Sequence, residues 1–597
     1  MLSAQNDTPK LASRLIWTGL GAVSILFHLG LIFSGLIPNL VSRPLHLALA
    51  LPWALVMVAK NPTERLIGII LSLLGLAATL YIVAYQDVLG DQYGYLEGNL
   101  QIIVSVVLIL IVLEMTRRAI GWPMPLVALI ALAYGLWGSH LPGEFGHPGM
   151  PLESFLGTLT ITEGGLWGKL TGVSVNIVAI FVIFGAVLNS GEAGQGFMNV
   201  ATAAAGRLKG GAAKVSVLSS ALFGSISGSA SANVASTGAI TLPAMTRLGY
   251  PRAFAGAVEA VASSGGQIMP PLMGAGAFVM VELTGVPYTS IILAALLPAL
   301  LYFATVWCGI NAFAGRHNLS GLNSADTPTL HTVAITSAFF LIPFTVLLVG
   351  MFWAGYTPQY AASLSILAGA VLLFIDGKLS FDWKRTLLRF ETVCVTAGKQ
   401  IAMIAAIILC ASLIIGVLGM TGLGIKLTSF ILAGSNGMLW PALLLTAIAC
   451  LILGMEVPTT AAYVICISVA GPALNQLGVP LLQAHLFVFW FALLSTITPP
   501  VCGAVFIAAG LVQENWLKVA LYAMALGIGL YLVPLAMIAN PALVGLEDTP
   551  GDALLSFAQV GLGLFAISYG VISKKAALLR LFLILAGGLI LFGLPLL

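Results

Sequence analysis

The chain alternates apolar segments with short polar loops over nearly its whole length. Segments that could cross a bilayer as helices lie at about 15–37, 45–59, 66–85, 100–116, 122–139, 173–190, 290–314, 331–353, 359–375, 398–419, 517–539, 553–572 and 577–596. Basic residues gather in alternate loops, and acidic residues gather in most of the others. Because basic residues mark the cytoplasmic side of a membrane, the pattern predicts a multi-pass membrane protein with a cytoplasmic N-terminus and an external C-terminus.

The composition excludes a large soluble domain. Of the 597 residues, 59% are hydrophobic and 8% are charged, and a soluble protein of this size could not cover its surface with so few polar groups. The six cysteines stand singly, without metal-ligand spacing, so we interpret them as small core residues. The sequence has no GxxxxGK[ST] motif and no HExxH motif, which argues against an ATP-driven motor and an embedded hydrolase. We therefore expect neither an enzyme nor an organic cofactor.

One apolar segment folds back on itself in this prediction. It begins at Lys214, is interrupted by glycine and serine at 224–231, and becomes apolar again before Arg247. Basic residues at both ends place both ends in the cytoplasm. A helix over 214–224 would rise about 15 Å, roughly half of a ~30 Å hydrocarbon core. The pattern therefore predicts a re-entrant helical hairpin at about 214–246, with its tip near the middle of the membrane.

The next apolar segment, at about 253–281, is broken by Ser-Ser-Gly-Gly-Gln-Ile-Met-Pro-Pro at 263–271. Glycines and a proline pair unwind a helix and free backbone carbonyls and amides. Such backbone persists at membrane depth only where protein buries it or where it lines a site. Secondary transporters build ion and substrate sites at the midplane from hairpin tips and broken helices.

These features recur later in the chain at one constant offset. Leu-Gly-Tyr-Pro at 248–251 matches Leu-Gly-Val-Pro at 477–480, and Pro-Pro-x-x-Gly at 270–274 matches the same pattern at 499–503. Several matches in one register indicate an internal repeat. We call the number of residues that separates Pro270 from Pro499 the repeat offset.

The repeat predicts a second hairpin at about 438–475 and a second broken segment at 481–511. Counting spans between the charged loops places the opening of the second hairpin on the outside, opposite to the first. The sequence thus predicts an inverted-topology repeat.

Each tip and its neighbouring break would form one site. The first site would combine 224–231 with 263–271, and the second would combine 454–460 with 495–500. Hydroxyls, Asn233 and freed carbonyls offer a monovalent cation several oxygen ligands without a strong base. The N-termini of the half-helices would offer amides and partial positive charge to a carboxylate substrate. The alternative is that the glycine and serine clusters only allow close helix packing.

Two carboxylates lie within these segments, Glu259 seven residues after Arg252 and Glu456 in the second tip. A charge at mid-bilayer costs about 2.5–3.5 kcal/mol even on insertion scales, so each should face protein or water. Either is a candidate proton-coupling residue. The alternatives are that Glu259 pairs with a basic neighbour, and that Glu456 is solvated by water or caps the helix that begins near Pro458. We interpret His485 as a hydrogen-bonded helix-packing residue.

The same motifs resemble a known family. Gly-Ser-Ile-Ser-Gly-Ser-Ala-Ser-Ala-Asn-Val at 224–234, Thr-Leu-Pro-Ala-Met at 241–245 and Ser-Gly-Gly-Gln-Ile-Met-Pro-Pro at 264–271 are similar to TRAP transporter permeases. The resemblance is to the type that fuses a small, four-helix (Q-like) subunit to a large, twelve-helix (M-like) subunit and works with TAXI-class binding proteins. It implies an all-α polytopic membrane protein with the ion-transporter-superfamily fold.

The resemblance also implies a division of the chain. The implied parts are a small-subunit-like scaffold at 1–145, a connecting segment at 146–172, the first repeat at 173–330, the second repeat at 331–545 and a two-helix extension at 546–597. Its location would be the bacterial cell inner membrane, and its mechanism an elevator in which a transport domain slides against a scaffold. A periplasmic substrate-binding protein would deliver a small organic acid to a monomeric permease.

Residue roles carry over by motif position. Roles at the first cation site would fall on Ser227, Ser229, Asn233, Gly265 and Gly266. Roles at the second cation site would fall on Gly454, Thr459, Thr460, Thr496 and Thr498. Substrate contacts would fall on Ser231, Thr460, Pro270 and Pro499. Glu456 adds a titratable group to otherwise neutral ligands at the second site.

We therefore expect import of a dicarboxylate such as glutamate or 2-oxoglutarate, coupled to sodium as the alkali cation. The first alternative is a proton-coupled version of the same transporter. The second is a one-component dicarboxylate symporter or exchanger without a binding protein, for which the N-terminal block would be superfluous. The third is a membrane-embedded enzyme, for which we find no catalytic cluster in the sequence.

Overall fold

A computed structural model describes residues 11–323, 327–454, 458–500 and 502–593. All regular elements in these ranges are helices, and the only β-type pairing among them is a bridge between Ile375 and Phe381. Ten of the described helices are long and apolar enough to cross a membrane by length and composition. The predicted all-α polytopic class is confirmed.

The chain divides into two compact units that interleave in sequence, and each is described by itself. The first unit combines the residues up to Ser139 with Pro148–Ala193 and Phe339–Val417. The second unit combines His140–His147, Gly194–Ala338 and the chain from Leu418 onward. The domains implied by the resemblance follow chain order instead, and they stay predictions.

The first unit contains α1 (Leu11–Phe33), α2 (Asn39–Pro52), the π-helix η1 (Trp53–Met57), α3 (Pro62–Ala84), α4 (Gln86–Asp91), α5 (Gly98–Ile120), α6 (Pro123–Trp137), α7 (Leu152–Thr160), α8 (Lys169–Val173), the π-helix η4 (Ser174–Val178), α9 (Ala179–Ser190) and α17 (Pro358–Leu372). Four elements pass from one unit into the other: η2 (Gly138–His140), α10 (Ala193–Ala205), α16 (Leu330–Phe352) and α18 (Trp383–Thr421). Local signals set several helix starts. Asn61 accepts a hydrogen bond from the backbone N–H of Glu64 at 2.7 Å, and Pro62 occupies the first turn of α3.

A buried hydrogen-bonded chain joins three elements of the first unit. Nε2 of His28 on α1 lies 2.8 Å from Nδ1 of His46 on α2. Nε2 of His46 lies 3.0 Å from the hydroxyl of Ser174 on η4, and Nδ1 of His28 lies 2.6 Å from the Ser24 carbonyl. These bonds connect α1 and α2 to η4, which directly precedes α9.

Two connections between the expected spans contain helix. The charged stretch at 376–389, between the expected spans at 359–375 and 398–419, enters α18 at Trp383, so this helix begins well before residue 398. Within α18, the charge of Arg389 is satisfied because its guanidinium donates to Glu192 and to the carbonyls of Leu373 and Ile375. The segment between the expected spans at 122–139 and 173–190 likewise contains α7.

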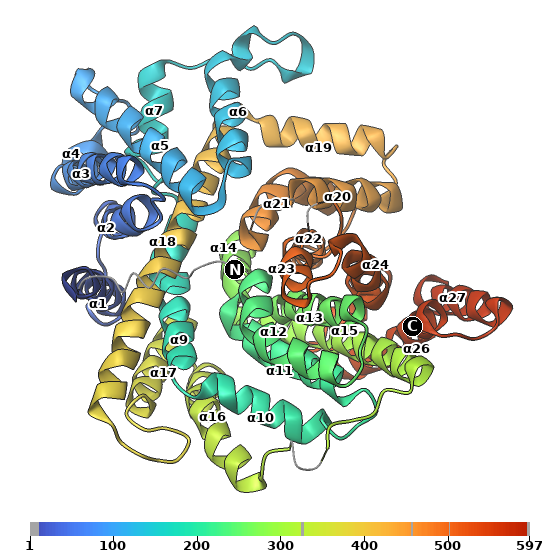
Figure 1. The fold of residues 1–597 in the computed structure, drawn as a ribbon. Coiled ribbons are helices and arrows are strands. Elements are labelled where there is room, and N and C mark those ends of the chain that lie inside the picture. The colour runs from blue at the N-terminus through green and yellow to red at the C-terminus, as the bar shows by residue number, and fades with distance from the viewer. Residues whose placement is uncertain (1–10, 324–326, 455–457, 501, 594–597) are drawn as a thin grey trace. The chain divides into compact units, whose positions relative to one another are not determined.

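The second unit contains η3 (Gly143–Phe145), α11 (Gly211–Ser227), α12 (Ala230–Arg247), α13 (Arg252–Gly265), η5 (Gly266–Ile268), α14 (Gly274–Thr284), α15 (Tyr288–His317), α19 (Leu423–Gly434), α20 (Leu439–Leu453), α21 (Thr459–Gln476), α22 (Leu481–Leu494), α23 (Gly503–Val512), α24 (Trp516–Leu526), α25 (Ile528–Ala539), η7 (Pro541–Val544), α26 (Pro550–Ile572) and α27 (Ala577–Phe592). The arms of the first hairpin, α11 and α12, pack against each other and against α13, and all three lie side by side in Figure 1. The second hairpin, α20 and α21, packs against α22.

The helix bounds follow the same repeat as the sequence. α12 and α21 begin and end at positions related by the repeat offset, and so do α13 and α22. The starts of α14 and α23 are related in the same way. Both hairpins begin and end close to their predicted bounds, 214–246 and 438–475. Glycine, serine and proline therefore place the tips and breaks where the sequence predicts them.

Candidate functional site

The first hairpin turns over two residues. Gly228 ends α11 in the left-handed conformation, with φ of +61°, which glycine adopts without steric cost. Ser229 then caps α12 by accepting a hydrogen bond from the backbone N–H of Ala232 at 3.3 Å. The tip thus ends one helix and starts the next, and the free amides of the first turn of α12 lie there.

Tip and break of the first repeat meet through glycines. A Cβ on Gly224 would lie 2.5 Å from Cα of Gly266, and a Cβ on Gly228 would lie 3.0 Å from Cα of Gly274. Side chains at these positions would prevent such close backbone approach. The structure therefore brings together the two halves of the first predicted site.

Asn233 links these parts. It is fully buried, and its Nδ2 donates to the carbonyl of Ser220 on α11 at 2.9 Å. A longer contact of 3.5 Å reaches the carbonyl of Ser263, the first residue of the break. One amide thus connects both hairpin arms to the broken helix.

A second polar cluster lies beside Asn233, around Glu259 on α13. The Glu259 side chain is fully buried. Hydroxyls that donate to its carboxylate belong to Ser216 (2.7 Å), Ser220 (3.3 Å), Ser263 (3.3 Å), Thr237 and Thr241. No ion pair reaches Glu259 from any part of the chain that the structure describes. The alternative that Glu259 pairs with a basic neighbour is therefore wrong, because hydroxyl groups of both hairpin arms occupy its surroundings.

The second repeat also brings its tip to its break. A Cβ on Gly454 would lie 2.9 Å from Oγ of Ser495. In the break, Thr498 donates to the Leu494 carbonyl at 2.7 Å, and its Oγ1 lies 2.7 Å from the hydroxyl of Tyr531 on α25. The candidate Glu456 lies outside the described residues.

The two sites adjoin within the second unit. Oγ of Ser264, in the first break, lies 2.8 Å from Oγ1 of Thr496, in the second break. A Cβ on Gly503, at the start of α23, would lie 3.4 Å from Oγ of Ser231, in the first turn of α12. Because Gly228 also faces Gly274, the N-termini of α12, α14 and α23 gather at this point. Helix N-termini carry free amides and partial positive charge, which suits an anion.

Other predicted site residues are placed less favourably. A Cβ on Gly265 would lie 2.1 Å from the Tyr302 ring, so this glycine faces α15 rather than the tip. Pro270 is buried, whereas Pro499 and Thr460 are half-buried and Thr459 is buried. The side chain of Ser227 lies outside the described residues.

Sequence reasoning gave no individual role to Ser264, although it lies in the predicted break at 263–271, and it missed Tyr531 and the hydroxyls that α11 and α12 direct to Glu259. A signal existed for the hydroxyls, because Ser216 and Ser220, and Thr237 and Thr241, are spaced four apart and so share a helix face. Tyr531 has no local signal, since only the packing of α25 brings it to Thr498.

His485 is confirmed as a hydrogen-bonded packing residue. Its Nδ1 lies 2.7 Å from the hydroxyl of Tyr463, and both side chains are buried between α21 and α22.

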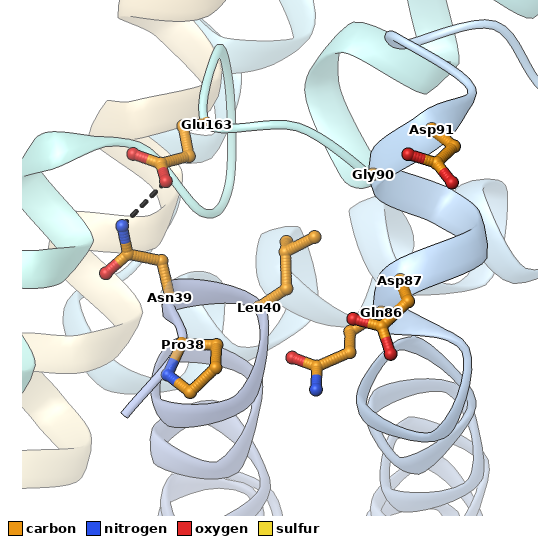
Figure 2. Close-up of a pocket in the computed structure, with 8 residues that line it drawn as sticks. All are labelled: Pro38, Asn39, Leu40, Gln86, Asp87, Gly90, Asp91 and Glu163. Carbon is orange, nitrogen blue, oxygen red and sulfur yellow. Dashed lines mark hydrogen bonds between the residues drawn. The ribbon is translucent and has the colours of Figure 1, made fainter. Parts of the chain in front are cut away.

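An acidic recess of about 340 Å³ lies in the first unit, and none of the predicted site residues lines it. Figure 2 shows its lining, with the carboxylates of Asp87 and Asp91 on α4 and Glu163 after α7. Asn39 donates to Glu163 at 2.6 Å, and Arg43 pairs with Glu163 at 3.3 Å. Arg43 lies in α2 and is buried, and Glu163 offers its guanidinium a charged partner there.

Comparisons with known proteins agree with the motifs. A family model described as "Tripartite ATP-independent periplasmic transporter, DctM component" matches residues 107–551. The chain is 27% identical over 330 residues to the C4-dicarboxylate TRAP transporter large permease protein DctM of Pseudomonas aeruginosa, covering 54% of this chain and 74% of that protein. It is 24% identical over 485 residues to the isethionate TRAP transporter permease protein DctMQ of Oleidesulfovibrio alaskensis, covering 80% and 69%. It is 24% identical over 435 residues to the C4-dicarboxylate TRAP transporter large permease protein DctM of Rhodobacter capsulatus, covering 67% and 96%.

Proposed function

Because this chain belongs to the DctM component family of tripartite ATP-independent periplasmic transporters, we propose that it is the membrane permease of a cation-coupled importer for a small organic acid. A separate periplasmic binding protein of the TAXI class delivers the substrate. We assign the fused small-subunit-like scaffold to residues 1–145, and the family match begins inside this block, at residue 107. The one observation that carries the proposal is the convergence of both tips and both breaks within the second unit, joined by Ser264 and Thr496.

The oxygen ligands at this point favour an alkali cation. Hydroxyls of Ser264, Thr496 and Thr498, with carbonyls freed at the breaks, are neutral donors without a strong base. Asn233 holds the first tip in contact with its break. We assign sodium to these ligands, and two sites related by the repeat accommodate it.

A carboxylate substrate suits the same region. No lysine or arginine occurs in 224–231, 263–274 or 495–503, so amides at the N-termini of α12, α14 and α23 would neutralise the anion. Two relatives are named for C4-dicarboxylates and one for isethionate. All three names denote small organic anions, and a dicarboxylate is the substrate class that we propose for this chain.

The mechanism that follows is an elevator. The two hairpins would open to opposite sides of the membrane, as the charge pattern predicts, so that each gates the site from one side. The tips and breaks would move together as one transport domain against a scaffold.

Uptake into proteoliposomes tests the proposal. The purified permease would be supplied with labelled dicarboxylates, with and without its binding protein, under separately imposed sodium and proton gradients. Uptake that requires both the binding protein and a sodium gradient supports it. Uptake without a binding protein would favour the one-component symporter or exchanger, and conversion of the substrate without transport would favour a membrane-embedded enzyme.

A further inference from the structure

The carboxyl group of Glu259 and the five hydroxyls around it form a site that the oxygen-lined cation sites do not use. We call these six residues the hydroxyl cage: Glu259, Ser216, Ser220, Thr237, Thr241 and Ser263. The cage joins α11, α12 and α13 at one buried point. We propose that the hydroxyl cage binds and releases one proton during transport, so that a proton serves as a coupling ion in addition to the cation at the breaks. This inference rests on the proposed transport function.

The hydrogen bonds of the cage suit both protonation states. An ionised carboxylate only accepts, and the hydroxyls can each donate to it. Two of the donors have alternative acceptors, because the Thr237 hydroxyl lies 2.8 Å from the Asn233 carbonyl and the Thr241 hydroxyl lies 3.1 Å from the Thr237 carbonyl. When a proton binds to an Oε atom of Glu259, the new O–H donates to a hydroxyl oxygen, and that hydroxyl turns to its helix carbonyl. Every polar atom keeps a partner in both states.

The second repeat shows that helix packing alone does not require this cluster. The positions that the repeat offset pairs with the cage residues are all apolar or thiol side chains: Leu445, Ala449, Cys466, Ala470, Val488 and Ala492. The first four of these help to line a small hollow of about 50 Å³ at the second hairpin. A hairpin therefore packs on its broken helix without a carboxylate, and burying one without a function would be costly.

Among the described residues, none of the charged and titratable groups on the elements packed against α13 forms an ion pair or a hydrogen bond with Glu259. On α11, the ammonium of Lys214 lies 4.9 Å from the ring centre of Trp307. On α24, Lys518 pairs with Glu514 at 3.5 Å, and Tyr522 packs edge-on against Phe254. The remaining groups are Arg247 on α12, Arg252 on α13 itself, and Tyr288, Tyr302, Cys308, Arg316 and His317 on α15. Tyr302 donates to the Val261 carbonyl at 2.7 Å, and His317 stacks on Phe313. The sequences of α23 and η5 contain no titratable residue.

The cage is connected to the first tip and break. Ser220 and Ser263 donate to Glu259 through their hydroxyls, and their carbonyls face Nδ2 of Asn233 at 2.9 and 3.5 Å. When the cage hydroxyls reorient, Ser220 and Ser263 are affected, and these two residues also bind Asn233 through their carbonyls. Proton binding and cation binding become linked through Asn233.

Infrared difference spectroscopy of the full-length permease in lipid, titrated with pH, tests the proposal. We expect a band from a protonated carboxyl group that titrates in the wild type, is absent in Glu259→Gln and is retained in the control Glu282→Gln. Thr241→Ala should keep the band with a displaced midpoint, because one hydrogen bond to the ionised carboxylate is lost. A band that persists unchanged in Glu259→Gln, or a midpoint unmoved in Thr241→Ala, overturns the proposal.

A second experiment measures uptake of labelled 2-oxoglutarate and succinate by the permease and its binding protein, with and without an imposed proton gradient. Acceleration by the gradient should fall at least tenfold in Glu259→Gln and not in Glu282→Gln. Equal acceleration in Glu259→Gln and wild type overturns the coupling role. The infrared result does not depend on transport, so failure of the cage and failure of the proposed function remain distinguishable.

Discussion

Ser264 and Thr496 place the broken helices of the two repeats in direct contact, with their hydroxyl oxygens 2.8 Å apart. Ser264 also lies within hydrogen-bond distance of the Ala260 carbonyl, at 2.8 Å, and Thr496 of the Leu493 carbonyl, at 2.7 Å. One hydroxyl therefore donates to the other, which donates to its own helix. The contact joins two breaks that are far apart in sequence, and it defines the centre of the candidate site.

This contact predicts that substitutions at the two positions are not additive. Ser264→Ala and Thr496→Val should each lower the sodium-dependent gain in thermal stability, because each removes one oxygen ligand and the shared hydrogen bond. The double variant should lose less stability than the sum of the singles, by about 0.5–1.5 kcal/mol. Thermal unfolding of the purified permease with and without sodium measures both effects.

The matched control is Ser468→Ala combined with Ser264→Ala. The Ser468 hydroxyl donates to the Val464 carbonyl of its own helix at 2.7 Å and lies in the same repeat as Thr496. That pair should be additive within about 0.5 kcal/mol. Additive losses for Ser264 and Thr496 would show that their hydroxyls do not act together.

Close backbone contact between the first tip and break predicts intolerance of a methyl group. Gly266→Ala would bring Cβ within 2.5 Å of Cα of Gly224, so tip or break must shift, at a cost of about 1–3 kcal/mol. Gly510→Ala on α23 is the control, since nothing lies within 4 Å of its Cβ position. We expect a lower unfolding midpoint and reduced uptake for Gly266→Ala and near-normal values for Gly510→Ala. Equal behaviour of the two variants would refute the close approach.

The histidine chain of the first unit predicts a loss of stability on removal of one hydroxyl. Ser174→Ala leaves Nε2 of His46 buried without this partner, which costs about 1–3 kcal/mol. Thr18→Ala is the control, because its hydroxyl donates to the Arg14 carbonyl within α1. Thermal unfolding should show the lower midpoint for Ser174→Ala, and a shift no larger than that of the control would contradict the chain's contribution.

Sequence patterns predicted the parts of the site that backbone chemistry determines. Gly228, the break at 263–271 and the proline pair at 499–500 are local signals, because glycine and proline restrict the backbone whatever surrounds them. The hydroxyl cage was not predicted, although its residues are visible in the sequence, since the helix face that meets Glu259 is fixed only by packing. Tyr531 and the interleaving of the two units depend on long-range contacts, which no local pattern reports.

The start of α18 gives a further test, because Arg389 is bound there by several acceptors at once. Its guanidinium donates to Glu192 and to the carbonyls of Leu373 and Ile375, the last at 2.6 Å, and the residue is 9% exposed. A lysine has a single ammonium and cannot reproduce this planar set of donors. Arg389→Lys should therefore lower the stability of the first unit by about 1.5–3 kcal/mol, the range for hydrogen bonds to charged groups.

The control for Arg389 is Lys384→Arg, an exposed position on the same helix. It should leave the unfolding midpoint within the scatter of the wild type, because surface charges contribute little. The readout is thermal unfolding of the purified permease, together with the rate of tryptic cleavage after Lys378 in the preceding loop. Cleavage should accelerate in Arg389→Lys, since the carbonyls of Leu373 and Ile375 would no longer be held against α18. If the two variants unfold at the same midpoint and are cleaved at the same rate, the guanidinium does not anchor this turn, and the extension of α18 through the charged stretch must have another cause.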